Sequence, residues 1–238
     1  MRVMVALIWV TLRGLLSRRR TLLLVLLVGL PVLIALLIRL SGGRPDADRV
    51  LDALVVRTVM PLVALILGTA AMGSELEDGT AVYLMVKPIS RWRIALAKLL
   101  VAGGLTTALV VPAVVLTGLL LGGAENATTI VAYSVACLVG GSAYAAAFMT
   151  LSIFTSRALL LGLAYTVLWE GVLAGLLEGT KFLSIRQATL GVTSALGAEL
   201  PGTPLDLSVS ALVLGVVLIG SFVLAGWRLS RFEIRGGD

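Results

Sequence analysis

The sequence contains no histidine and only one cysteine in 238 residues. Histidine is the most common metal ligand and the usual proton carrier near neutral pH, so its absence removes both kinds of site. The single cysteine, Cys137, can form neither a disulfide within the chain nor a multi-cysteine metal site. We therefore expect no catalytic residue that depends on histidine and no metal site.

The sequence also lacks the phosphate-binding pattern G-x-x-x-x-G-K-[ST], in which backbone N–H groups and a lysine hold nucleotide phosphates. Nucleophilic sites built from serine and lysine do not need histidine. However, none of the lysines (Lys87, Lys98 and Lys181) lies in the middle of an apolar segment beside a serine. We therefore expect that the chain is not an enzyme and binds no cofactor of its own.

Charged residues are scarce, at 13% of the chain, against about 25% in typical globular proteins. Hydrophobic residues make up 59%, and the mean hydropathy is +1.07. These values predict an integral membrane protein. The net charge of +6 fits basic flanks on membrane spans. It does not indicate a nucleic-acid partner, because no basic stretch alternates with aromatic residues that could stack on bases.

Long apolar segments alternate with short polar ones along the whole chain. Each apolar segment has about the 20 residues needed to cross a bilayer as a helix. The predicted spans cover residues 21–40, 55–73, 91–122, 127–155, 158–177 and 208–227. We therefore predict an all-α, polytopic membrane protein in which residues 1–238 form a single transmembrane domain.

Three segments between or before these spans have their own predictions. Residues 1–17 are borderline in length for a span and predict an interfacial helix anchored by Trp9, with a frayed start as the alternative. Residues 41–51 are polar and contain glycine and proline, which predicts a loop. Residues 179–207 are too polar to span and predict one or two short helices with a loop, either at the outer surface or dipping back into the membrane.

The distribution of basic residues predicts the orientation. If the N-terminus lies inside, most of the 19 lysine and arginine residues fall on the inner side. The positive-inside rule then places both termini and the loop 74–98 in the cytoplasm of a multi-pass protein in the cell membrane.

The loop 74–98 is the longest polar interruption between apolar segments. Ser74 and Glu77 match a capping box at a helix start, and Asp78-Gly79 breaks the chain after it. Thr80 then predicts the start of a short helix over 81–86. Its apolar side chains would be unfavourable in water, so we expect this helix to lie across the membrane face and to contact another protein.

The same loop resembles the loop between the second and third spans of type 2 ABC exporter permeases. The residues that carry the resemblance are Glu75, Glu77, Gly79, Thr80, Pro88, Ile89, Ser90, Arg91 and Lys98. The resemblance implies a type V exporter-like fold in which residues 74–90 form a cytoplasmic coupling loop, whose coupling helix docks into a separate ATPase subunit. It also implies that residues 1–17 form an elbow helix. The residues expected to couple to the ATPase are Glu75, Glu77, Asp78, Gly79, Thr80, Tyr83, Pro88 and Arg91.

The resemblance further implies an assembly of two permease copies, expected to be a homodimer, with two ATPase subunits that bind ATP and Mg²⁺. The chain itself would form the substrate path. The resemblance does not specify the substrate, which could be a drug, a lipid, a peptide or a polysaccharide precursor. The alternative is a polytopic scaffold or assembly factor without transport. A secondary transporter is disfavoured, because ionisable residues within the spans are few and no internal repeat is apparent.

The candidate path residues are Tyr165, Trp169 and Glu170 in the fifth predicted span. An ionisable residue at depth costs about 2.5–3.5 kcal/mol on insertion scales, so Glu170 should have a partner. It either lines the path, bonds to the backbone of a broken helix, or lies near the outer headgroups with Lys181 or Arg186. Tyr165 and Trp169 are four residues apart and would share a helix face, although Trp169 also suits an interfacial belt.

Overall fold

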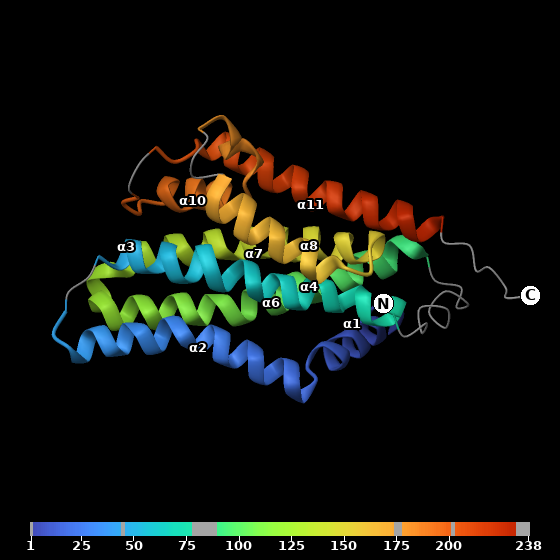
Figure 1. The fold of residues 1–238 in the computed structure, drawn as a ribbon, viewed down its shortest axis with the longest axis horizontal. Coiled ribbons are helices and arrows are strands. Elements are labelled where there is room, and N and C mark those ends of the chain that lie inside the picture. Colours follow the sequence, from blue (N-terminus) through green and yellow to red (C-terminus); the bar gives the residue numbers. More distant parts are fainter. Residues whose placement is uncertain (1, 44–45, 78–89, 174–177, 201–202, 232–238) are drawn as a thin grey trace, which may run out of the picture.

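A computed structural model describes residues 2–43, 46–77, 90–173, 178–200 and 203–231 of the chain (Figure 1). All regular elements within these ranges are helices. In chain order they are α1 (Arg2–Leu15), α2 (Arg18–Leu40), α3 (Ala47–Val50), the π-helix η1 (Leu51–Val59), α4 (Met60–Glu77), α6 (Arg91–Gly122), the 3-10 turn η2 (Gly123–Asn126), α7 (Ala127–Phe154), α8 (Ala158–Ala164), the π-helix η3 (Tyr165–Leu173), the 3-10 helix η4 (Glu178–Leu183), α10 (Ile185–Ala195) and α11 (Leu207–Ser230).

Five of the described helices are long and apolar enough to cross a membrane. They correspond to every predicted span except the fifth, where the apolar helix Ala158–Val172 is shorter. Residues 174–177 of that predicted span lie outside the described residues. The prediction of an all-α polytopic fold is therefore confirmed, although the described residues contain five helices of spanning length and one shorter helix in place of the six predicted spans.

The helix boundaries differ from the predictions at the second span. The predicted loop 41–51 is wrong in its second half, because a helix begins at Ala47 and continues through η1 into α4. Asp46 stands at the N-cap, and its side chain accepts a hydrogen bond from the backbone N–H of Asp48. This cap starts the helix before the apolar residues begin.

The predicted helix start at Ser74 is also wrong. α4 continues unbroken through Glu77, so Ser74 lies inside its last turns. The preceding apolar run carries the helix past the capping pattern, and serine and glutamate are tolerated inside a helix. The short helix predicted over 81–86 lies outside the described residues. Ser90 does precede α6 at the N-cap position, but its side chain makes no capping hydrogen bond.

α7 forms the centre of the bundle and packs against α4, α6, α10 and α11. Its small residues allow backbones to come close, as the sequence predicts for 140–147. A Cβ on Gly68 of α4 would lie 2.7 Å from the Ala145 carbonyl oxygen of α7. α2 packs on the outside against α6, and many of its leucines are exposed toward the surroundings.

The predicted polar segment 179–207 forms η4, α10 and the connection to α11. α10 lies against both α7 and α11 (Figure 1), and its residues 188–193 are buried. A Cβ on Gly140, near the middle of α7, would collide with Thr189 of α10. α10 therefore packs between the spans of the bundle. Whether this segment dips back into the membrane stays a prediction.

The helix ends define two ends of the bundle. α1 begins, α4 ends, α6 begins and α11 ends at one end, here called the termini end (Figure 1). The turn η2 and the beginning of α3 lie at the other end, here called the distal end. α1 is helical as predicted and packs against α6 and α4, while Trp9 is exposed beneath the Arg13 guanidinium.

Because α10 packs tightly against α7 at Gly140, we predict that Gly140→Ala destabilises the protein. The added methyl would meet Thr189, and overpacking of this kind costs about 1–3 kcal/mol. Cys137 is the single cysteine and is fully buried, so thermal unfolding in detergent can be followed with a thiol-reactive dye. We expect the midpoint to fall by several degrees, at about 2–4 °C per kcal/mol.

Gly215→Ala is the matched control, because a Cβ there meets nothing within 4 Å. It should leave the midpoint unchanged or raise it, since alanine favours a helix. Equal midpoints for the two variants would contradict the packing described for α10.

Candidate functional site

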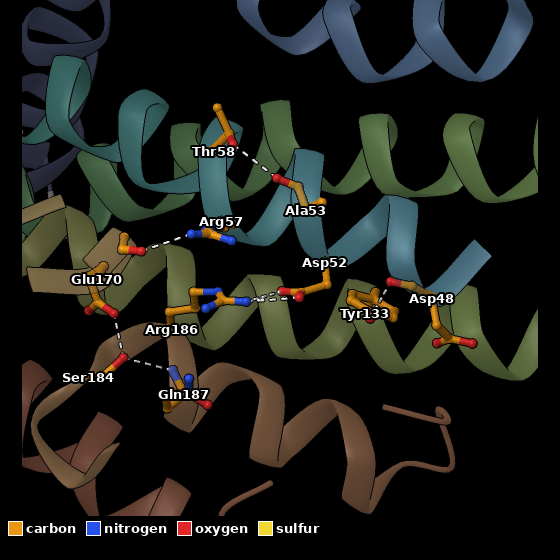
Figure 2. A network of polar contacts seen from close by, with 11 residues as sticks. Asp48, Asp52, Ala53, Arg57, Thr58, Tyr133, Glu170, Ser184, Arg186 and Gln187 are labelled. Carbon is orange, nitrogen blue, oxygen red and sulfur yellow. Dashed lines mark hydrogen bonds and ion pairs between the residues drawn. The ribbon is translucent and has the colours of Figure 1, made fainter. Parts of the chain in front are cut away.

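Two π-helical segments and the start of α10 meet inside the bundle (Figure 2). π-helical turns are rare and frequently mark functional sites. η1 precedes α4 in the second span, and η3 continues α8 in the fifth predicted span. Met60, directly after η1, packs beside Gly141 at the middle of α7. The meeting point therefore lies about halfway along the bundle.

Pro61 accounts for the change of helical period at the end of η1. Proline has no N–H to donate, so the ordinary hydrogen bond to the carbonyl of Arg57 cannot form there. The π-helix ends two residues earlier, at Val59, and the N–H of Met60 bonds to the Val55 carbonyl. The proline then occupies the first turn of α4, where its missing N–H costs least.

Glu170 connects η3 to the start of α10. Its side chain is 2% exposed and accepts hydrogen bonds from the Ser184 hydroxyl, the Ile185 N–H at 3.0 Å and the Tyr165 hydroxyl at 2.8 Å. Ser184 in turn accepts from the N–H of Gln187 at 3.0 Å. A carboxylate at a helix N-terminus satisfies free N–H groups and interacts favourably with the helix dipole. Glu170 therefore caps α10 inside the bundle.

This arrangement identifies the partners of Glu170 within the described part of the chain. It bonds to the backbone of a broken helix, and neither of the basic residues proposed from the sequence pairs with it. Lys181 donates to the Thr203 hydroxyl at 3.3 Å, and Arg186 pairs with Asp52. Glu170 is buried, and the start of α10 supplies two of its donors; its position relative to the headgroups stays a prediction.

Asp52 and Arg186 form a second link to α10. The Arg186 Nη2 lies 2.9 Å from one Asp52 oxygen and 3.0 Å from the other, so both carboxylate oxygens accept from it. The two side chains are only 12% and 21% exposed. Because Asp52 lies on η1, this ion pair holds α10 against the second span.

Arg57 links the two π-helices directly. Its Nη2 donates to the Gly171 carbonyl at 2.8 Å, across from η1 to η3. Within the part of the chain that the structure describes, no carboxylate lies within ion-pair distance of its guanidinium. The Arg57 side chain is also exposed. A guanidinium at this depth that is paired only with a carbonyl is the least compensated charge of the cluster.

The candidate path residues separate in the structure. Tyr165 and Glu170 are joined by a hydrogen bond, whereas the Trp169 Nε1 faces the Leu183 carbonyl at 3.4 Å. The expected shared face of Tyr165 and Trp169 assumed an α-helix. In η3 the turn is wider, because it is π-helical, and so the residue next to Tyr165 is the one five positions later, Glu170. The Tyr144 hydroxyl of α7 is buried and makes no hydrogen bond within the described part of the chain.

The residues expected to contact an ATPase can be placed only in part. Glu75 and Glu77 lie in the last turns of α4, and Arg91 begins α6, both at the termini end. The remaining residues of this set lie outside the described residues: Asp78, Gly79, Thr80, Tyr83 and Pro88. The structure therefore brings together the two helix ends that flank the loop, and the role of the loop stays a prediction.

Sequence reasoning assigned no role to Asp52 or Arg57 and considered Arg186 only as a partner for Glu170, whereas the structure joins all three to the cluster. A signal was present, because ionisable residues interrupt apolar stretches at positions where a charge needs a partner. Lys98 is another buried ionisable residue to which sequence reasoning gave no partner: it is 2% exposed, and its Nζ donates to the Ala71 carbonyl at 2.6 Å.

No group of three His, Cys, Asp or Glu side chains in the described part of the chain could hold a metal ion.

Comparison with protein families gives a match to the model described as "ABC-2 family transporter protein", over residues 16–179. The matched region covers more than half of the chain, including the loop 74–90, Arg57 and Glu170. A comparison with curated proteins gives no match.

Replacing Glu170 tests its role as the cap of α10. Glu170→Leu leaves three donors without an acceptor, and each unsatisfied buried donor costs about 1–3 kcal/mol. We expect the amide hydrogens of α10 to exchange at least tenfold faster than in the wild type, measured by mass spectrometry on the detergent-purified protein. Glu170→Gln should give a smaller effect, because the amide oxygen still accepts.

Glu125→Gln is the control, since Glu125 is exposed in the turn before α7. Unchanged exchange of α10 in Glu170→Leu would show that another contact holds the helix.

The Asp52–Arg186 pair predicts a non-additive pair of substitutions. Arg186→Ala leaves the Asp52 carboxylate buried without its cation, which costs about 3–5 kcal/mol for a buried pair. Asp52→Ala/Arg186→Ala removes both charges and should be the more stable variant, with a higher dye-detected unfolding midpoint. A double variant less stable than Arg186→Ala would argue against a direct ion pair.

Proposed function

The chain belongs to the ABC-2 transporter family, and on that premise we propose that it is the permease subunit of an ATP-driven exporter. ATP and Mg²⁺ would bind to a separate ATPase subunit, because this chain has no phosphate-binding loop. The loop 74–90 would dock into that subunit. Two permease copies, expected to be identical, would enclose the substrate path in the cell membrane.

The observation that carries this proposal is the family match across the loop and the spans on both sides of it. The fold supports it, because α4 ends and α6 begins beside α1 at the termini end (Figure 1). A coupling helix in the loop 74–90 would be attached to the end of α4 and the start of α6, so its movement would move both helices directly. Force applied to the loop would then reach η1, which continues α4 into the polar cluster.

The charge distribution supports a cytoplasmic position for the termini end. Arginines gather at the helix ends there, as the positive-inside rule requires of a cytoplasmic face. They are Arg13, Arg18, Arg19, Arg20, Arg91, Arg93, Arg157, Arg228 and Arg231. With this orientation the loop 74–90 lies on the side where ATP is available.

The polar cluster supports a path beside η1 and η3. Charged and hydrogen-bonding side chains inside a membrane domain are costly, and they commonly mark substrate routes. Tyr165 and Glu170 would form part of the wall of this path on the side of α10. Trp169 would line it where it contacts Leu183.

Charge reversal in the loop tests the proposal. The full chain is purified with its co-expressed ATPase, and ATP hydrolysis is measured in proteoliposomes. Glu77→Lys/Asp78→Lys should lower both the amount of bound ATPase and the hydrolysis rate at least tenfold, because like charges would then face the docking surface.

Glu125→Lys/Glu199→Lys makes the same charge change at the distal end and is the matched control. It should leave both readouts unchanged. If the loop variant binds and activates the ATPase as well as the control does, the loop is not the coupling element.

A further inference from the structure

A partly exposed stripe runs along one face of α4. Between Met60 and Gly73, the residues that are not buried are Leu62, Ile66, Ala70 and Gly73. Their spacing of four, four and three residues places them on one face of the helix. α2 and α8 pack on either side of α4 (Figure 1), so the stripe forms the floor between these two helices. Its lining is apolar along most of its length.

The stripe ends in a cavity of 270 Å³ toward the termini end. Its lining includes Arg20 and Leu23 of α2, Leu159 of α8, and the hydroxyl-bearing residues Ser152 and Thr155. None of the described lining residues is a carboxylate. Its volume is close to the lower limit of about 300 Å³ for small-molecule sites. It therefore offers one cation, several hydroxyl groups and an apolar wall.

Arg20 differs from the two arginines before it. Arg18 and Arg19 are exposed, whereas Arg20 is half-buried in the cavity wall. In the described part of the chain, no carboxylate lies within ion-pair distance of Arg20. A half-buried guanidinium without an anion is an available partner for an anionic ligand.

Arg57 lies at the opposite end of the stripe. It is exposed, and its guanidinium is anchored to the Gly171 carbonyl, which leaves further N–H donors to point away from η3 (Figure 2). The carboxylates nearest to it along the cluster are engaged elsewhere. Asp52 is paired with Arg186, and Glu170 accepts three hydrogen bonds at the start of α10.

Gly73, which lines the cavity together with Arg20, lies about 24 Å along the helix axis from Arg57, at 1.5 Å of rise per residue. One small anionic group therefore cannot contact both at once. An exposed guanidinium halfway through the membrane costs about 2.5–3.5 kcal/mol unless it faces water or an anion. The apolar floor between the arginines suits hydrocarbon chains.

From this geometry we propose that the stripe on α4 is a track for an anionic amphiphile, whose negatively charged head binds first to Arg20 and then to Arg57. The inference rests on the proposed export function and specifies its substrate class. The head carries at least one negative charge, such as a phosphate or carboxylate, and the chains lie over Leu62 and Ile66. Arg20 and Arg57 are the residues that determine specificity.

Direct binding to the purified permease tests the track without any ATPase. The probe is a fluorescent short-chain phosphatidic acid, compared with a phosphatidylcholine that has the same chains and label. The wild type should bind the anionic probe at least tenfold more tightly. Arg20→Gln and Arg57→Gln should each reduce this preference, because a charged hydrogen bond of about 1.5–3 kcal/mol is worth tenfold or more in affinity. Arg20→Gln/Arg57→Gln should abolish it.

Three comparisons make the result specific. Arg57→Lys keeps the charge and should retain most of the preference, and Arg19→Gln removes an exposed neighbouring charge and should have no effect. Ile66→Trp fills the floor without changing the charge, so it should weaken binding of both probes. This last variant tests the track independently if Arg57→Gln does not fold, as judged by gel filtration.

An undiminished preference for the anionic probe in the double variant would overturn the proposal. So would displacement of the probe by millimolar inorganic phosphate, which would indicate a site for soluble anions and not for amphiphiles. Because no ATPase is present, failure here leaves the coupling experiment unaffected. Conversely, a loop without a role in coupling would not change the binding result.

Discussion

The structure depends on how a buried carboxylate is satisfied where no bulk water can reach it. A membrane interior requires each polar group to find its partner within the protein. Glu170 meets this requirement with the Ser184 hydroxyl, the Ile185 N–H and the Tyr165 hydroxyl. The same bonds satisfy the start of α10, whose free N–H groups would otherwise be costly inside the bundle. A helix can therefore begin halfway along the bundle because a charge from η3 is there to cap it.

Three contacts connect three elements of the cluster in a closed set. Glu170 joins η3 to α10, Asp52–Arg186 joins η1 to α10, and Arg57 joins η1 to the Gly171 carbonyl of η3. Because η1 continues into α4, a movement of α4 would be transmitted to α10 and η3 together. In the proposed exporter, this set would carry motion from the loop at the termini end to the middle of the membrane.

The sequence predicted the helices better than the site. Apolar length alone located Arg91–Gly122 correctly, because a membrane span has a fixed minimum length. The predictions failed where local chemistry overrides apolar length: Asp46 starts a helix early, and α4 continues through Ser74. The pairing of Tyr165 with Glu170 could not be predicted, since no sequence pattern indicates that η3 is a π-helix. Two partners of Glu170, Ser184 and Ile185, lie at the start of α10, and that helix is positioned by tertiary contacts such as those of Gly140 with Thr189 and of Arg186 with Asp52.

The central claim is that a capped helix and an uncompensated arginine lie inside the membrane beside a transport path. A cryo-EM map of the permease with its ATPase in a lipid nanodisc tests it most directly. The account predicts Ile185 near the mid-plane of the bilayer, Arg57 facing a space enclosed by protein, and the loop 74–90 in contact with the ATPase. A map with α10 lying flat on the outer surface, or with Arg57 facing the lipid, would contradict it.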